Sequence, residues 1–388
     1  MSKSIAILGS TGSIGTSALK VISALGDDYR VVALSAHSNY ALLAEQVRLY
    51  RPAVVAISDP AKAGDLHEAV AGLDVEILTG PGSLEQIARL AEVDILITAV
   101  VGAAGLPAVL AGAECGKRLA IANKEPLAIA GQLLTEVAQK SGATILPVDS
   151  EHSAIYQAMQ AGTHDEVTKI ILTASGGPFR SATGDQIRNA TIEDALAHPT
   201  WNMGPKVTID SATMMNKALE VIEAHWLFDM PVDKIEVLIH PESIVHSMVE
   251  FVDGAVIAQM GLPDMCLPIQ YALTWPKRLR GVGRPLKLEE FGTLTFEKPN
   301  LKTFRALSLG YEVARTGGSA PVVFNAANEA AVKEFLAGKI KFGTIAETIE
   351  QCLCKHEAKT LDSLDELFEI DAWAREEVKK CLKQQKVH

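Results

Sequence analysis

Residues 144–157, TILPVDSEHSAIYQ, place two carboxylates two positions apart at the end of an apolar run. The run at 145–148 predicts a buried strand, and Asp149 and Glu151 follow it. In an extended chain these side chains would share one side, about 6–7 Å apart, and would repel unless a cation lay between them. Two carboxylates can hold Mg²⁺ or Mn²⁺. The alternative is a cap, with Asp149 or Ser150 as N-cap of a following helix and Glu151 in its first turn.

A glycine-rich turn, ILGSTGSIG, follows the first apolar run and carries Gly9, Gly12 and Gly15. This spacing is a variant of the dinucleotide fingerprint, in which glycines let the backbone approach a pyrophosphate at a helix N-terminus. Its place between a predicted strand and a predicted helix favours a nucleotide site over a turn without a ligand.

The second predicted strand ends in LSAHSN at 34–39, without the Asp or Glu that an NAD site usually has there. NADP is therefore favoured, with Ala36, His37 and Asn39 as candidate contacts.

Further candidates lie in four short segments. Asn123, Lys124 and Glu125 follow a predicted strand, either at a ligand-binding edge or simply at a helix start. Segments 175–177 (SGG) and 198–204 (HPTWNMG) are loops, and the second is either a lid or a loop whose Trp fills a hydrophobic gap. His240 and His246 fit a site or the core equally.

Asn216, Lys217 and Glu220 share one face of a predicted helix within DSATMMNKALEVIEAHW, residues 210–226. They are either site residues or a solvated ion pair on the surface.

Strand and helix patterns alternate through the first 150 residues, which predicts an α/β protein with an N-terminal doubly wound, Rossmann-like parallel sheet. A strand at 169–174 and a hairpin at 251–256 predict a central α+β domain. Amphipathic segments at 302–315, 325–337, 345–356 and 372–384 predict a C-terminal helical bundle. The expected domains are 1–149 for the nucleotide, 150–274 for catalysis with a lid near 197–207, a linker at 275–300, and the bundle at 301–388.

The 388 residues carry a net charge of −11, which argues against nucleic acid as a partner but leaves a locally positive pocket possible. Five cysteines without a metal or disulfide pattern suit a reducing compartment. No apolar run approaches the roughly 20 residues that span a membrane. We expect a cytoplasmic protein with no membrane partner.

The motifs GSTGSIG, ANKE, VDSEHSA, SGGPF, HPTWNMG, DSATMMNKALEVIEA, IHPESIVHSMV and NAANE occur in this order along the chain. In this respect the whole sequence resembles the 1-deoxy-D-xylulose 5-phosphate reductoisomerase family. The resemblance implies NADPH- and metal-dependent rearrangement and reduction of a phosphorylated sugar, in isoprenoid biosynthesis, by a homodimer. The alternatives are an NADP-dependent dehydrogenase without rearrangement and a non-catalytic dinucleotide sensor.

The resemblance also implies roles for individual residues. Asp149, Glu151 and Glu220 match the metal ligands, and together with Lys124 and His198 they are the expected catalytic residues. The expected substrate contacts are Lys124, Ser150, Glu151, Ser175, His198, Trp201, Ser211, Asn216, Lys217 and Glu220. The expected cofactor contacts are Thr11, Gly12, Ser13, Ile14, Ala36, His37, Asn39, Asn123, Glu125 and Gly204, and Met203 matches the lid with Trp201.

One position departs from the family pattern. Many members carry Gly-Lys where this chain has His37-Ser38. Lysine is a permanent cation at neutral pH, whereas histidine is charged mainly at acid pH. The affinity for the 2′-phosphate of the cofactor is therefore expected to differ.

Overall fold

The computed structural model describes residues 2–201 and 203–385. The chain forms two compact units. The first comprises Met1–Pro126, Gln132–Ser153 and Asp264–Arg284, and the second comprises Leu127–Gly131, Ala154–Pro263 and Pro285–His388.

The first unit contains the predicted parallel sheet, so that prediction is confirmed. Its strands are β1 (Lys3–Leu8), β2 (Tyr29–Ala36), β3 (Val54–Ile57), β4 (Glu76–Thr79), β5 (Ile95–Thr98), β6 (Arg118–Ile121) and β7 (Thr144–Pro147). They pair in parallel in the order β4-β3-β2-β1-β5-β6-β7. The chain adds strands on one side of β1 and then returns to add β5 on the other side. Ligands of such sheets bind at this reversal, beyond the carboxyl ends of the strands.

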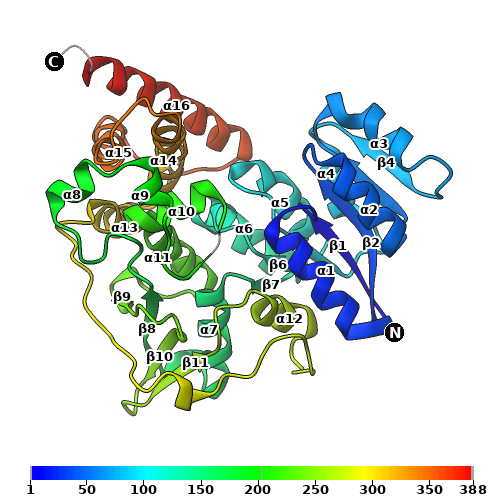
Figure 1. Ribbon diagram of the computed structural model, residues 1–388, viewed down its shortest axis with the longest axis horizontal. Coiled ribbons are helices and arrows are strands. Elements are labelled where there is room, and N and C mark those ends of the chain that lie inside the picture. Colours follow the sequence, from blue (N-terminus) through cyan, green and yellow to red (C-terminus); the bar gives the residue numbers. More distant parts are fainter. Residues whose placement is uncertain (1, 202, 386–388) are drawn as a thin grey trace. The chain divides into compact units, whose positions relative to one another are not determined.

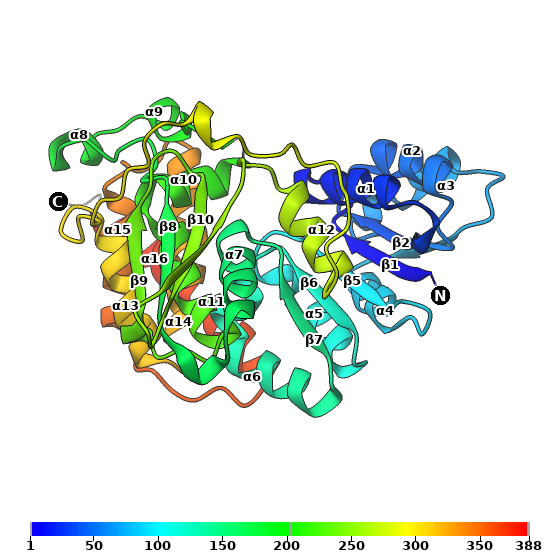
Figure 2. The same ribbon diagram turned by 90° about the horizontal axis from the view of Figure 1, so that it is seen from below.

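Helices cover both faces of this sheet. They are α1 (Ser13–Leu25), α2 (Tyr40–Tyr50), α3 (Ala63–Ala69), α4 (Ser83–Arg89), α5 (Leu106–Glu114), α6 (Glu125–Ser141) and α12 (Cys266–Thr274). Figure 2 shows α1 and α2 on one face and α4 and α5 on the other. Strands covered on both faces must be apolar throughout, and the last four residues of β1 are fully buried.

The second unit is built on a four-stranded sheet in the order β11-β10-β8-β9. The strands are β8 (Val167–Ala174), β9 (Ile235–Ile239), β10 (Val245–Phe251) and β11 (Val256–Met260). β10 runs antiparallel to β8 and β11, whereas β8 and β9 are parallel. The hairpin predicted at 251–256 is therefore confirmed, and its turn contains Gly254 with a φ of +84°.

Helices make up the rest of this unit. They are α8 (Gly184–Arg188), α9 (Ile192–Leu196), α10 (Pro205–Thr213), α11 (Met215–Leu227), α13 (Arg305–Thr316), α14 (Ala320–Leu336), α15 (Thr344–Cys354) and α16 (Leu364–Gln385). Figure 1 shows α14, α15 and α16 packed together, which confirms the predicted C-terminal helices. α11 packs against β8, β9 and α13. α7 (Ser150–Ala158) begins in the first unit and ends in the second.

The compact units differ in extent from the predicted domains. Residues of 264–284 group with the first unit because α12 packs against α1 and β6. The three-domain division of function therefore stays a prediction. Among the described residues, no helix is both long and apolar enough to cross a membrane.

Candidate active site

The turn between β1 and α1 brings backbone atoms very close together. Gly9 has a φ of +85°, and a Cβ on it would lie 2.6 Å from the carbonyl oxygen of Ala99. A Cβ on Gly15 would lie 2.4 Å from the carbonyl oxygen of Gly9. Gly12 is the N-cap of α1, which no side-chain hydrogen bond caps within the described part of the chain. The first N–H groups of α1 can therefore receive an oxyanion.

The segment after β2 carries polar groups beside this turn. His37 Nδ1 lies 2.9 Å from Ser58 Oγ, and the Asn39 side chain accepts a backbone N–H as the N-cap of α2. The second strand ends without a carboxylate, as predicted. However, Asp59 at the end of neighbouring β3 donates its N–H to the His37 carbonyl oxygen at 3.0 Å. The prediction from the end of the second strand alone missed Asp59. This residue is 22 positions from His37 in the sequence but follows the adjacent strand of the sheet.

Asn123 lies on the other side of β1, where β6 ends. Its Oδ1 accepts a hydrogen bond from Thr98 Oγ1 at 3.2 Å, whereas its buried Nδ2 has no partner among the described residues. An unpaired buried donor costs about 1–3 kcal/mol, so the position suits a ligand that accepts a hydrogen bond. Glu125, the first residue of α6, is 4% exposed. The residues of this edge fit a bound dinucleotide.

Asp149 and Glu151 do not continue the strand. β7 ends at Pro147 and α7 begins at Ser150, so Glu151 lies in the first helical turn. Asp149 Oδ1 accepts the N–H of Glu151 at 3.3 Å, and Ser150 Oγ donates to the Glu151 carboxylate. The expected extended pair is therefore wrong, because capping the helix starts the turn one residue after Asp149. Asp149 therefore caps the helix and is also one of the predicted carboxylate ligands.

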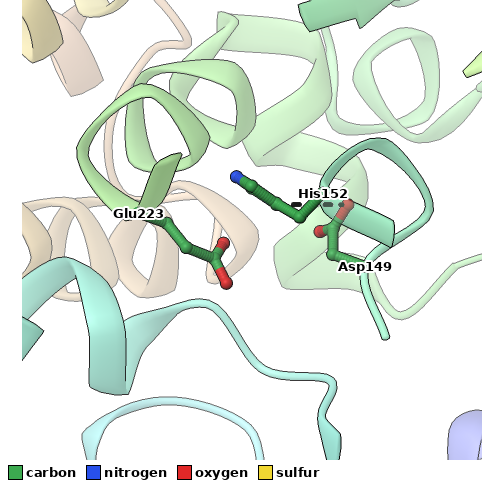
Figure 3. A group of neighbouring side chains, drawn as sticks. All are labelled: Asp149, His152 and Glu223. Atoms are coloured by element: carbon green, nitrogen blue, oxygen red, sulfur yellow. Dashed lines mark ion pairs between the residues drawn. The ribbon is translucent and has the colours of Figure 1, made fainter. Parts of the chain in front are cut away.

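Lys124 and His152 lie beside Asp149. Lys124 Nζ lies 2.8 Å from its Oδ2, and His152 Nδ1 lies 3.8 Å from its Oδ1. Figure 3 draws Asp149, His152 and Glu223 of α11, and marks the Asp149–His152 ion pair with a dashed line. Burial alone would raise the pKa of Asp149, but Lys124 and His152 outweigh it and hold that pKa well below its usual range. Asp149 is thus an anion across the physiological pH range.

The face of α11 holds a buried carboxylate with two donors. Asn216 Nδ2 donates to Glu220 Oε1 at 2.5 Å, and Lys217 Nζ lies 2.5 Å from Glu220 Oε2. The side chains of Lys217 and Glu220 are 4% and 0% exposed. The predicted grouping on one face is confirmed, but a solvated surface pair is excluded by this burial. A buried pair breaks only at a large cost.

His198 joins two loops of the second unit. Its Nδ1 accepts the N–H groups of Thr200 and Trp201 at 3.1 and 2.9 Å. The Nε2 atom lies 3.1 Å from Ser175 Oγ, in the loop after β8. Because Nδ1 is occupied as an acceptor, the proton of the neutral ring must be on Nε2. Burial lowers the pKa of His198, which favours this neutral form.

The same loop lies against α10. A Cβ on Gly177 would lie 2.8 Å from the carbonyl oxygen of Ser211, so only glycine permits this approach. The neighbouring Asp210 is 1% exposed. It pairs with Lys206 Nζ at 2.8 Å and accepts from Asn328 Nδ2 of α14 at 2.8 Å. Sequence reasoning missed this anchor, since Asp210 and Asn328 lie 118 positions apart.

The predicted lid is described apart from Asn202, which lies outside the described residues. The ring centroids of Trp201 and His246 are 6.4 Å apart. Met203 is half-buried and Gly204, the N-cap of α10, is exposed. Whether this loop closes over a ligand stays a prediction.

His240 belongs to the core rather than to an open site. It is fully buried, and its Nε2 accepts the N–H groups of Ile244 and Val245 at 3.1 Å each. The ring therefore holds the turn between β9 and β10, one of the two readings left open for this residue.

Comparison with known proteins gives one consistent family. Models described as 1-deoxy-D-xylulose 5-phosphate reductoisomerase and the C-terminal domains of that enzyme match residues 5–131, 145–228 and 260–377. The reductoisomerase of Trichlorobacter lovleyi is 50% identical over 373 residues, covering 96% of both chains. That of Geobacillus sp. is 50% identical over 381 residues, covering 98% of this chain and 100% of the relative.

Solved structures agree. The Zymomonas mobilis reductoisomerase in complex with NADPH is 42% identical with a TM-score of 0.93, covering 98% of this chain and 99% of that chain. A reductoisomerase in complex with NADPH, fosmidomycin and magnesium is also 42% identical with a TM-score of 0.93, covering 99% of both chains. The chain belongs to the 1-deoxy-D-xylulose 5-phosphate reductoisomerase family.

Proposed function

We propose that the protein is an NADPH- and divalent-metal-dependent oxidoreductase that converts 1-deoxy-D-xylulose 5-phosphate to 2-C-methyl-D-erythritol 4-phosphate. The observation that carries the proposal is a set of carboxylates beyond what a nucleotide fold requires. Asp149 and Glu151 lie at the edge of the parallel sheet, and Glu220 is fully buried on α11. Solved relatives in complex with NADPH or magnesium support the choice of cofactors.

The nucleotide is assigned to the carboxyl edge around β1. The glycine turn offers backbone N–H groups to the pyrophosphate, and Asn123 Nδ2 offers a donor that has no partner among the described residues. The proposed contacts are Thr11, Gly12, Ser13, Ile14, Ala36, His37, Asn39, Asn123, Glu125 and Gly204.

The metal, Mg²⁺ or Mn²⁺, is assigned to Asp149, Glu151 and Glu220. Carboxylate oxygens are the ligands that both ions prefer. Two of these carboxylates already hold cations, Lys124 at Asp149 and Lys217 at Glu220, so they select positive charge. When bound, the metal supplies a Lewis acid for the substrate carbonyl and hydroxyl oxygens, and NADPH supplies hydride.

The substrate phosphate is assigned to Ser175, His198, Ser211, Asn216 and Lys217, and its other contacts to Lys124, Ser150 and Trp201. Lys217 can serve the phosphate only by leaving or sharing Glu220, because their charged atoms are 2.5 Å apart. A dication at Glu220 provides the replacement positive charge. Metal binding and phosphate binding should therefore favour each other.

His198 is proposed to donate its Nε2–H to the phosphate as a neutral imidazole. The acceptor role of Nδ1 fixes that tautomer and holds the backbone at Thr200 and Trp201. The same ring thereby links the phosphate to the start of the lid segment. In the closed state the lid would exclude water from the site.

The experiment is product analysis with metal-dependent NADPH oxidation. The purified protein is supplied with 1-deoxy-D-xylulose 5-phosphate, NADPH and Mn²⁺ or EDTA. A branched-chain product formed only with metal is expected. An unbranched alcohol would support a plain dehydrogenase, and no NADPH oxidation would support a non-catalytic dinucleotide sensor.

We also propose that the protein is a cytoplasmic homodimer. β11 is the edge strand of its sheet, and Val256 and Ile257 on it are 48% and 38% exposed. Exposed apolar edge strands tend to pair with another chain, and we propose a second copy of this chain as the partner. All five cysteines are free, which suits a reducing compartment. Light scattering of the parent and of Val256→Lys tests the dimer, since the lysine should shift the mass towards one chain.

A further inference from the structure

A buried polar network lies beneath the glycine turn, among residues that have no assigned role. Ser10 and Ser35 are 0% and 1% exposed, and Gln46 of α2 is 5% exposed. Polar side chains buried this deeply are costly unless hydrogen bonds satisfy them. In this network, hydrogen bonds connect Ser10, Ser35 and Gln46 and reach the backbone of the glycine turn.

Both the oxygen and the nitrogen of the Gln46 amide form hydrogen bonds with Ser10. Ser10 Oγ donates to Gln46 Oε1 at 2.6 Å, and Gln46 Nε2 donates to the Ser10 carbonyl oxygen at 2.9 Å. These two bonds fix both the side chain and the backbone of one turn residue. The pairing also fixes which end of the amide is nitrogen, since a carbonyl oxygen accepts only from the N–H₂ group.

The network continues to the end of β2. Ser10 N–H donates to the Ser35 carbonyl oxygen at 2.8 Å, and Gly9 N–H donates to Ser35 Oγ at 3.0 Å. Ser35 directly precedes Ala36 and His37. Gln46 thus acts on a turn that is joined to the segment proposed to meet the 2′-phosphate.

We propose that Gln46 is a positioning residue for the dinucleotide. It holds Ser10, and Ser10 holds the glycine turn in the shape that presents the first N–H groups of α1 to the pyrophosphate. This inference rests on the proposed use of that turn by NADPH. The pyrophosphate is common to NADPH and NADH, so Gln46 serves both cofactors, whereas the residues after β2 discriminate between them.

The first test replaces Gln46 by Met, which has similar length and no hydrogen-bonding amide. The Ser10 carbonyl oxygen then loses its donor, and the dissociation constants of NADPH and NADH should each rise about tenfold. They are measured by calorimetry on the substrate-free protein. The KM for the phosphorylated substrate should change less than about twofold. Gln86→Met, at an exposed glutamine of α4 in the same unit, is the matched control and should leave both constants unchanged.

The second test is Gln46→Glu, which adds a pH signature that a packing role would not produce. Ionised glutamate cannot donate to the Ser10 carbonyl oxygen, whereas the protonated acid can donate there and still accept from Ser10 Oγ. Burial against that carbonyl oxygen raises the pKa of the introduced acid. NADPH affinity relative to the parent should therefore recover as pH falls from 8 to 5.5. Other titrating groups, such as His37 and Asp59, are shared with the parent and with Gln46→Met and cancel in the ratio.

The outcomes separate this inference from the proposed function. A parent that binds neither cofactor overturns the proposed function itself. A parent that binds NADPH while Gln46→Met binds it equally well overturns only the positioning role. A loss confined to NADPH, or a pH-independent ratio for Gln46→Glu, also overturns it.

Discussion

Replacing Glu220 by Gln tests the proposed metal site through stability as well as activity. The Glu220 side chain is 0% exposed, and Lys217, its partner at 2.5 Å, is 4% exposed. Removing one partner of a buried ion pair costs about 3–5 kcal/mol. The glutamine amide also brings a second donor towards Lys217 and Asn216, which are donors already. With a typical stability of about 5–15 kcal/mol, the metal-free variant should remain folded but clearly weakened.

Metal should widen this difference. At a Mn²⁺ concentration of about 100 times the parent's dissociation constant, binding adds about 2.7 kcal/mol to the parent. Glu220→Gln should gain much less, and its turnover should fall with its metal affinity. Urea unfolding followed by circular dichroism, in EDTA and in Mn²⁺, measures both effects.

Two controls make the result specific. Glu223→Gln changes another buried acid of α11, which forms a second group of possible metal ligands with Asp149 and His152. It should keep most of the gain from metal if Glu220 is the ligand. Lys217→Met combined with Glu220→Gln removes both charges and should be more stable in EDTA than Glu220→Gln alone, because the buried cation is removed together with its counter-charge. If Glu220→Gln lost under 1 kcal/mol in EDTA, or gained as much from Mn²⁺ as the parent, the reasoning would be refuted.

Three other changes probe single contacts. Burial lowers the pKa of His198 in the folded protein. The stability that neutral His198 contributes is therefore present above the pKa of the unfolded state and is lost as pH falls through the lower pKa of the folded state. His198→Gln should reduce the drop in unfolding temperature between pH 7.5 and pH 5. Asp59→Asn should tighten NADPH about two- to fivefold without changing NADH, and Ser38→Lys should act in the same direction, as Michaelis constants for both cofactors will show. Asn328→Asp sets a second carboxylate against Asp210 and should cost about 2–4 kcal/mol in urea unfolding, and adding Asp210→Asn should recover part of it. Equal losses in the single and double variants would contradict a direct contact.

Local patterns sufficed for the architecture. The parallel sheet could be predicted because strands buried on both faces are apolar at every position, and the C-terminal helices because each hides one face. The hairpin turn at Gly254 could be placed for a similar local reason, since its φ of +84° favours glycine.

Side-chain environments could not be predicted in the same way. The spacing of Lys217 and Glu220 is the same on a solvated helix and in a core, so only the packing of α11 distinguishes the two. Asp149 and Glu151 read equally well as strand-end residues or as a helix start, and the structure makes them a helix start. Gln46 and Ser10 lie 36 positions apart, and no periodicity connects an amide to a carbonyl at that range.

The two anions of the proposed reaction are met by different means. The cofactor pyrophosphate is offered backbone N–H groups at α1, a turn stabilised by neutral hydrogen bonds from Ser10 and Gln46. For the substrate phosphate we propose Lys217, a buried cation that is paired with Glu220. Neutral hydrogen-bond donors can be buried without a counter-charge when no ligand is bound, whereas burying an unpaired lysine costs much more free energy. In the proposal, Glu220 stabilises Lys217 when substrate is absent and would bind a dication once Lys217 contacts the phosphate. In the proposed site, a dication at Glu220 would therefore free the positive charge of Lys217 for the phosphate.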